Sequence, residues 1–169
     1  NLYECGRIVF QNQKDNAPNR IARLLEHLIF CAVAPKSVAN RQTHIVSLGQ
    51  TETYAAIGQE AARELLKEWL VYFRIGQNTP LPFFAKTSLA AAEEYGKKED
   101  WDTALRKAYD VFNGNKMNKA QKEYTEVKLV FGHSDEVPLE EPLFENLVVN
   151  LLVPLLNSAA GKNNATEQE

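Results

Sequence analysis

The feature that most constrains the fold of this 169-residue sequence is an apolar run that ends at a proline. Residues 28–34 read Leu-Ile-Phe-Cys-Ala-Val-Ala, and Pro35 follows them. Upstream of the run, apolar residues recur at steps of three and four from Ile21, which predicts a helix over residues 19–34. Because the end of this helix is apolar nearly all round, it must be buried on more than one side, against a sheet or other helices.

The rest of the chain predicts more helices than strands. Strands are expected over residues 2–10 (one strand, or two short ones broken at Gly6) and over residues 43–48. Helices are expected over residues 58–75, from Thr87 or Ser88 to Tyr95, from Asp100 or Asp102 to Gly114, and over residues 139–156 with Pro154 kinking or ending the last one. Residues 123–131 fit a strand and a helix equally well. The predicted fold class is α+β, dominated by helices around a small sheet.

Composition and charge place the chain among ordinary globular domains. Apolar residues make up 44% and charged residues 24% of the chain, and the length favours one domain. We expect this domain to cover residues 1–156 and a polar, disordered tail to cover residues 157–169. The net charge is −3, spread as +3 over residues 1–41 and −6 over residues 135–169, so the chain as a whole lacks a basic nucleic-acid footprint.

The sequence also predicts a protein without a membrane segment. No apolar run reaches the roughly 20 residues that a membrane-spanning helix needs, and no signal peptide is expected at the N-terminal end. The two cysteines, Cys5 and Cys31, are too few for a disulfide framework, so the expectation is reduced thiols in a cytoplasmic protein.

Motifs for common enzyme chemistries are missing from the sequence. It contains no dinucleotide, P-loop, zinc-protease or nucleophile-elbow motif. His27 and Cys31 have the i, i+4 spacing of metal ligands on one helix, but no second pair of ligands accompanies them. We interpret them as a core histidine and a buried thiol, and predict no catalytic residue, no metal ligand and no cofactor. Trp69 and Trp101 are likewise assigned to structure.

One motif supports an alternative function. Glu126-Val127-Lys128 matches the Glu-x-Lys element of Mg²⁺-dependent nucleases, in which it lies on a strand beside a second carboxylate. Asp110 is the nearest upstream candidate for that carboxylate, and it falls inside a predicted amphipathic helix. An active nuclease using these residues is therefore the alternative to a non-catalytic domain.

Two further segments are candidate contact sites. Three lysines stand close together at Lys116, Lys119 and Lys122, and clustered lysines suit contact with a DNA backbone as well as a solvated loop. The apolar segment Pro80-Leu81-Pro82-Phe83-Phe84, held extended by its prolines, is a candidate for contact with a partner protein.

Three segments of the sequence, in order, together resemble one known family. Residues 25–32 (Leu-Glu-His-Leu-Ile-Phe-Cys-Ala) resemble the W-x-x-H-L-x-x-C-A helix of the C-terminal domain of RecC, the gamma subunit of exodeoxyribonuclease V. Residues 79–88 (Thr-Pro-Leu-Pro-Phe-Phe-Ala-Lys-Thr-Ser) resemble the proline-rich stretch that follows the long helix in that family. The helix at residues 104–109 and the following Gly114-Asn115 are similar to the next motif. Together the three segments and their spacing cover most of residues 7–156.

The resemblance implies a partial restriction-endonuclease-like fold, related to the nuclease domain of RecB but without its catalytic carboxylates. It implies a non-catalytic part of the RecBCD helicase–nuclease in double-strand break repair, with RecB and RecD as partner subunits and double-stranded DNA ends as the substrate of the whole complex. ATP and Mg²⁺ would then act through the other subunits. The remaining alternative is a helical adaptor domain unrelated to DNA repair.

Overall fold

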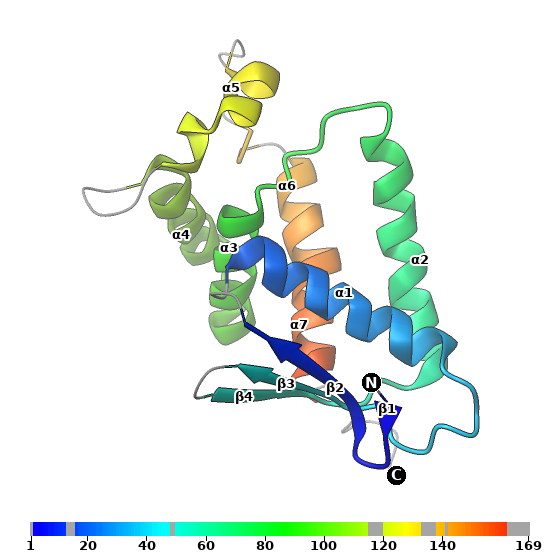
Figure 1. Ribbon diagram of the computed structural model, residues 1–169. Coiled ribbons are helices and arrows are strands. Elements are labelled where there is room, and N and C mark those ends of the chain that lie inside the picture. The colour runs from blue at the N-terminus through cyan, green and yellow to red at the C-terminus, as the bar shows by residue number, and fades with distance from the viewer. Residues whose placement is uncertain are drawn as a thin grey trace. The chain divides into compact units, whose positions relative to one another are not determined.

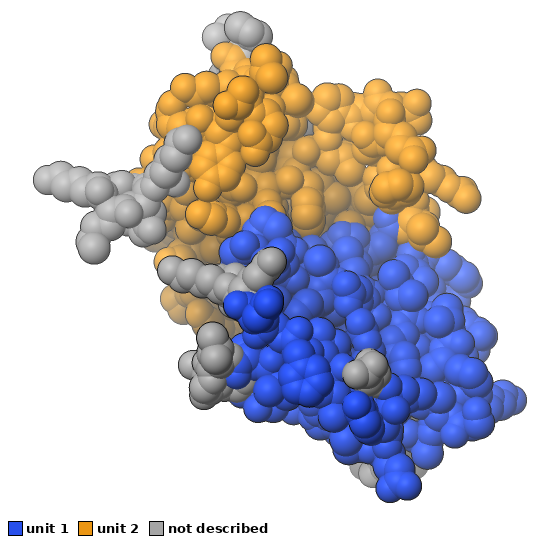
Figure 2. Space-filling view, viewed as in Figure 1, with its two compact units in different colours: residues 1–69, 155–169 blue, residues 70–154 orange. Residues whose placement is uncertain are grey.

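The computed structural model describes residues 2–12, 16–47, 50–114, 120–132, 138–140 and 142–161. The chain forms two compact units, which are described separately below (Figure 2). Unit 1 contains residues 1–69 and 155–169, and unit 2 contains residues 70–154. The fold class is α+β, mostly helical with a small sheet, as the sequence predicts.

Unit 1 is built on a mixed sheet of four strands in the order β1-β2-β3-β4. These are β1 (Leu2–Tyr3), β2 (Gly6–Gln11), β3 (Thr43–Ser47) and β4 (Gln50–Tyr54). The central pair, β2 and β3, is parallel and starts at the register Arg7↔Thr43, whereas both outer pairs are antiparallel. The first predicted strand is therefore two strands separated before Gly6, and β4 is a strand that the sequence analysis missed.

Gly6 explains why the first strand is interrupted there. Its φ of +115° is a conformation that residues with a Cβ rarely adopt, and a Cβ at this position would lie 2.5 Å from the Gln42 carbonyl oxygen. The chain can pass this close to Gln42 only with a glycine at this point.

Helix α1 (Ala17–Val33) connects the parallel strands β2 and β3 and covers one face of the sheet (Figure 1). Asn16 caps its start, because the Asn16 side chain accepts a hydrogen bond of 2.9 Å from the Asn19 backbone N–H. Leu24, Leu28 and Cys31 on α1 are at most 1% exposed. Within the apolar run, Leu28, Cys31 and Ala32 lie in the core of unit 1, as predicted, but Ile29 is 46% and Val33 is 66% exposed. The prediction that the end of this helix is buried nearly all round is therefore wrong for these two residues, because the sheet and the other helices of unit 1 cover only part of its circumference.

The core of unit 1 combines residues from its sheet and from three helices. Helix α2 (Gln59–Gly76) contributes Ala62, and α7 (Val153–Ala159) contributes Leu155 and Ala159. The Ala55 backbone N–H, just after β4, donates to the Ala159 carbonyl oxygen over 2.8 Å. Two segments separated by about a hundred residues of sequence therefore close one core.

Helix α2 packs an apolar stripe against the core of unit 1 only over its first half. Ala62 is fully buried, and Leu65, Leu66 and Trp69 pack partly buried against the core of unit 1. The same stripe continues to Phe73, whose side chain is 64% exposed. On the polar side, two i, i+3 ion pairs are present, from Arg63 to Glu60 and from Lys67 to Glu64.

Unit 2 is centred on the helix pair α3 (Ala85–Lys98) and α4 (Trp101–Asn113). Small residues let the two backbones approach: Ala91, Ala104 and Ala108 are completely buried. Helix α3 continues past Tyr95, the predicted end, and through Gly96. It ends at Glu99, which has a left-handed φ of 53° and whose N–H donates to the Tyr95 carbonyl oxygen over 2.7 Å.

A buried side chain from another element stabilises the start of α3. Gln121, on the 3-10 helix η1 (Gln121–Glu123), accepts hydrogen bonds from the Thr87 backbone N–H over 3.0 Å and from its hydroxyl over 2.8 Å. The expected cap, Thr87 or Ser88, therefore lies inside the first turn, where Ser88 Oγ accepts from the Phe84 backbone N–H over 3.0 Å. Gln121 supplies the acceptor that the start of this helix needs.

Residues 123–131, which the sequence left open between strand and helix, are helical. After η1 the chain forms α5 (Thr125–Phe131). Val127 is the buried residue of α5, and the Phe131 ring lies 5.3 Å from the ring of Phe84, centroid to centroid. Val127 and Phe131 would share one side in a helix or in a strand, but a strand would place Leu129 on that side too. Leu129 is 73% exposed, which agrees with the helix.

The last helical stretch accommodates Pro154 instead of ending there. It consists of α6 (Pro142–Asn146), the π-helical segment η2 (Leu147–Leu152) and α7. Proline lacks an N–H and its ring would collide with the carbonyl four residues back. The neighbouring Val153 N–H donates to the Val148 carbonyl oxygen, five residues back, and this wider turn makes room for the proline. The helix ends at Ala159 rather than at residue 156. Of the expected tail, residues 162–169 lie outside the described residues.

Candidate functional site

Of the three candidate lysines for DNA contact, Lys122 lies in the part of the chain that the structure describes. Lys122 is exposed on η1, and its Nζ donates to Asn113 Oδ1 over 3.0 Å. Lys116 and Lys119 lie outside the described residues. The structure adds a lysine that sequence spacing did not reveal: Lys86, exposed on α3, donates to the Tyr124 hydroxyl over 3.2 Å. Lys86 and Lys122 thus both carry exposed ammonium groups where α3 meets η1.

The proline-rich segment between α2 and α3 is only partly accessible. It forms no regular helix or strand, as its prolines predict. Pro80 is exposed and Leu81 and Phe83 are half-buried, whereas Pro82 and Phe84 are buried in unit 2. The Phe84 ring packs 5.0 Å from that of Phe112, centroid to centroid. The accessible part of this segment is therefore its Pro80 end together with one face of Leu81 and Phe83.

The residues of the alternative nuclease site lie on two different helices. Glu126 and Lys128 are on α5, and Asp110 is on α4. Residues two apart on a helix point in different directions, so the Glu-x-Lys element is not presented as it would be on a strand. Lys128 forms an ion pair with Glu123 of η1. The strand that this motif requires is therefore contradicted at residues 126–128.

His27 is hydrogen-bonded at both ring nitrogens and completely buried. Nε2 lies 2.8 Å from the Ala55 carbonyl oxygen, and Nδ1 lies 2.8 Å from Thr43 Oγ1. A carbonyl oxygen can only accept, so Nε2 carries the proton and Nδ1 accepts from the Thr43 hydroxyl. This is the neutral form of histidine, and burial, with a smaller effect from the charge of Arg7, lowers the pKa of His27 from 6.5 to about 4.

The partner of His27 in the suspected ligand pair is Cys31. Its Sγ lies 3.7 Å from His27 Nε2 and 3.5 Å from the Arg41 carbonyl oxygen. Burial raises the pKa of the Cys31 thiol, which disfavours the thiolate that binds metals. His27 and Cys31 therefore tie α1 to the sheet and its following loop, in agreement with their interpretation as core residues.

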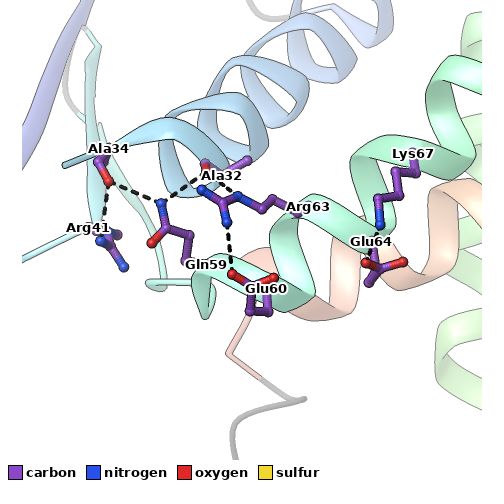
Figure 3. A network of polar contacts seen from close by, with 8 residues as sticks. All are labelled: Ala32, Ala34, Arg41, Gln59, Glu60, Arg63, Glu64 and Lys67. Carbon is purple, nitrogen blue, oxygen red and sulfur yellow. Dashed lines mark hydrogen bonds and ion pairs between the residues drawn. The ribbon is translucent and has the colours of Figure 1, made fainter. Parts of the chain in front are cut away.

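A network of side-chain hydrogen bonds caps the C-terminal end of α1 (Figure 3). The Ala32 carbonyl oxygen accepts from Gln59 Nε2 over 3.1 Å and from Arg63 Nε over 3.2 Å. The Ala34 carbonyl oxygen accepts from Arg41 Nη2 and from Gln59 Nε2, each over 3.3 Å. Carbonyls at a helix end lack partners within the helix and carry partial negative charge. These contacts satisfy them, so this polar cluster is accounted for by structure.

Two further features of the described residues concern metals and membranes. Among those residues, no group of three or more His, Cys, Asp or Glu side chains could hold a metal ion. One stretch, Pro142–Ala159, is long and apolar enough to cross a membrane by length and composition alone, and half of it is buried in the protein. Core helices have the same composition, so this stretch does not in itself indicate a membrane protein.

Comparison with known proteins identifies the family. The model of the RecC C-terminal domain matches residues 1–96, more than half of the chain. The chain belongs to the RecC C-terminal domain family. The resemblance found in residues 25–32 and 79–88 is thus confirmed, and an adaptor domain unrelated to DNA repair is excluded. No curated protein matches the chain.

Membership in the RecC family indicates the complex in which this chain acts. RecC C-terminal domains belong to the RecBCD complex, a DNA-repair assembly of several subunits. The matched region covers the sheet and α1 and α2, and it ends within α3. Lys86 therefore lies inside the matched region. The other candidate residues lie beyond it: Asp110, Lys122, Glu126 and Lys128.

Proposed function

We propose that this RecC-family chain is a non-catalytic, nuclease-like domain that acts through its surfaces in a cytoplasmic RecBCD complex. It contacts the RecB and RecD subunits and borders the path of the DNA. The family match supports the role in the complex. The placement of Glu126 and Lys128 on helix α5, with Lys128 paired to Glu123, supports the absence of catalysis by this domain. We further propose that the domain continues beyond the matched residues, through residue 156.

The proposed contact surfaces follow from what is accessible. For partner subunits, the exposed Pro80 and the accessible faces of Leu81 and Phe83 are the contact residues, while Pro82 and Phe84 support them from inside unit 2. For the DNA backbone, Lys122 acts together with Lys86, and Lys116 and Lys119 belong to the same proposal. Lysine side chains neutralise phosphates without reading sequence, which suits a complex that handles DNA ends.

The proposal is tested by assembly and by cleavage. The protein carrying this chain is expected to co-purify with its RecB and RecD subunits, and a failure to do so would contradict the role in the complex. The chain alone, given linear or supercoiled DNA with Mg²⁺ or Mn²⁺, is expected to leave the DNA intact. Cleavage that disappears in Glu126→Ala and persists in Glu60→Ala, a control that removes an exposed carboxylate on α2, would establish the alternative, an active nuclease.

A further inference from the structure

We draw no further inference here: the strongest candidate, the exposed apolar surface on the C-terminal half of helix α2 around Leu70 and Phe73, carries none because nothing in the described part of the chain shows what covers it.

Discussion

At the scale of single residues, Gly6 carries a constraint that no other residue type can meet. Replacing Gly6 by alanine forces a Cβ to within 2.5 Å of the Gln42 carbonyl oxygen at a φ of +115°. We expect Gly6→Ala to lower the free energy of unfolding by about 3 kcal/mol, measured by urea denaturation. Gly58→Ala is the matched control, since nothing lies within 4 Å of a Cβ there. A Gly6→Ala protein as stable as Gly58→Ala would contradict the close approach.

His27 makes the stability of unit 1 depend on pH in a defined window. Its pKa is about 4 in the folded protein, below the ordinary value of 6.5. Between these values the unfolded chain binds more protons than the folded one, so stability falls as the pH is lowered from 6.5 towards 4. The loss over the whole window is about 3 kcal/mol, from 1.4 kcal/mol per unit of pKa.

The titration is measured directly by NMR of the His27 ring together with urea denaturation between pH 5 and 7.5. We expect the His27 ring to remain neutral through pH 5 and the free energy of unfolding to fall as pH falls. His44→Gln is the control that should keep this pH dependence. Protonation of His27 near pH 6.5 would contradict the hydrogen-bonded neutral ring.

At the scale of elements, Gln121 connects η1 to the start of α3. Its side-chain oxygen accepts two hydrogen bonds from Thr87 and is buried. We expect Gln121→Ala to lower the free energy of unfolding by about 1–3 kcal/mol, because the Thr87 donors are then left without their acceptor. Lys122→Ala, on the same short helix but exposed, should cost less than about 0.5 kcal/mol. Equal effects of the two variants on thermal melting would show that the cap is dispensable.

The helices and strands also show which structural features can be predicted from the sequence. Helix α1 and strand β3 follow from periodicity and β-branched residues, and they were predicted within two residues of their ends. Strand β4 was missed because Gln-Thr-Glu-Thr-Tyr has a single large apolar residue, although its threonines after Gly49 are a usable signal. The helix through Pro154 could not be predicted, because local rules end a helix there and only the surrounding packing retains it.

For the candidate site, the sequence predicted which residues matter better than it predicted which of them are buried or close together. The burial of His27 was predicted from the lack of a second pair of metal ligands beside His27 and Cys31, and it is confirmed. The burial of Phe84, by contrast, depends on α4 and α5, which pack against Phe84 through Phe112 and Phe131. Lys86 escaped notice because it is far in sequence from Lys122, and only the contact of Lys86 with Tyr124 and of Thr87 with Gln121 brings them together.

At the scale of the whole molecule, the charge distribution limits the affinity for DNA. With a net charge of −3 and few exposed lysines on η1 and α3, we expect binding weaker than micromolar at 0.15 M salt and strongly reduced by added salt. In fluorescence anisotropy, Lys86→Ala combined with Lys122→Ala should lower the slope of log K against log salt by about 2. Lys67→Ala, which removes an exposed lysine paired with Glu64, is the control. Nanomolar binding at physiological salt would contradict this prediction.

The division of unit 1 between the two ends of the chain has a consequence for its biosynthesis. Leu155 and Ala159 complete a core that is otherwise made from residues 9–69, and Ala159 also receives the hydrogen bond of Ala55. A ribosome must therefore translate all of unit 2 before unit 1 can finish folding. Until then the core of unit 1 is incomplete, and a premature stop before the codon for Leu155 would remove residues that the sheet and α1 need for their packing.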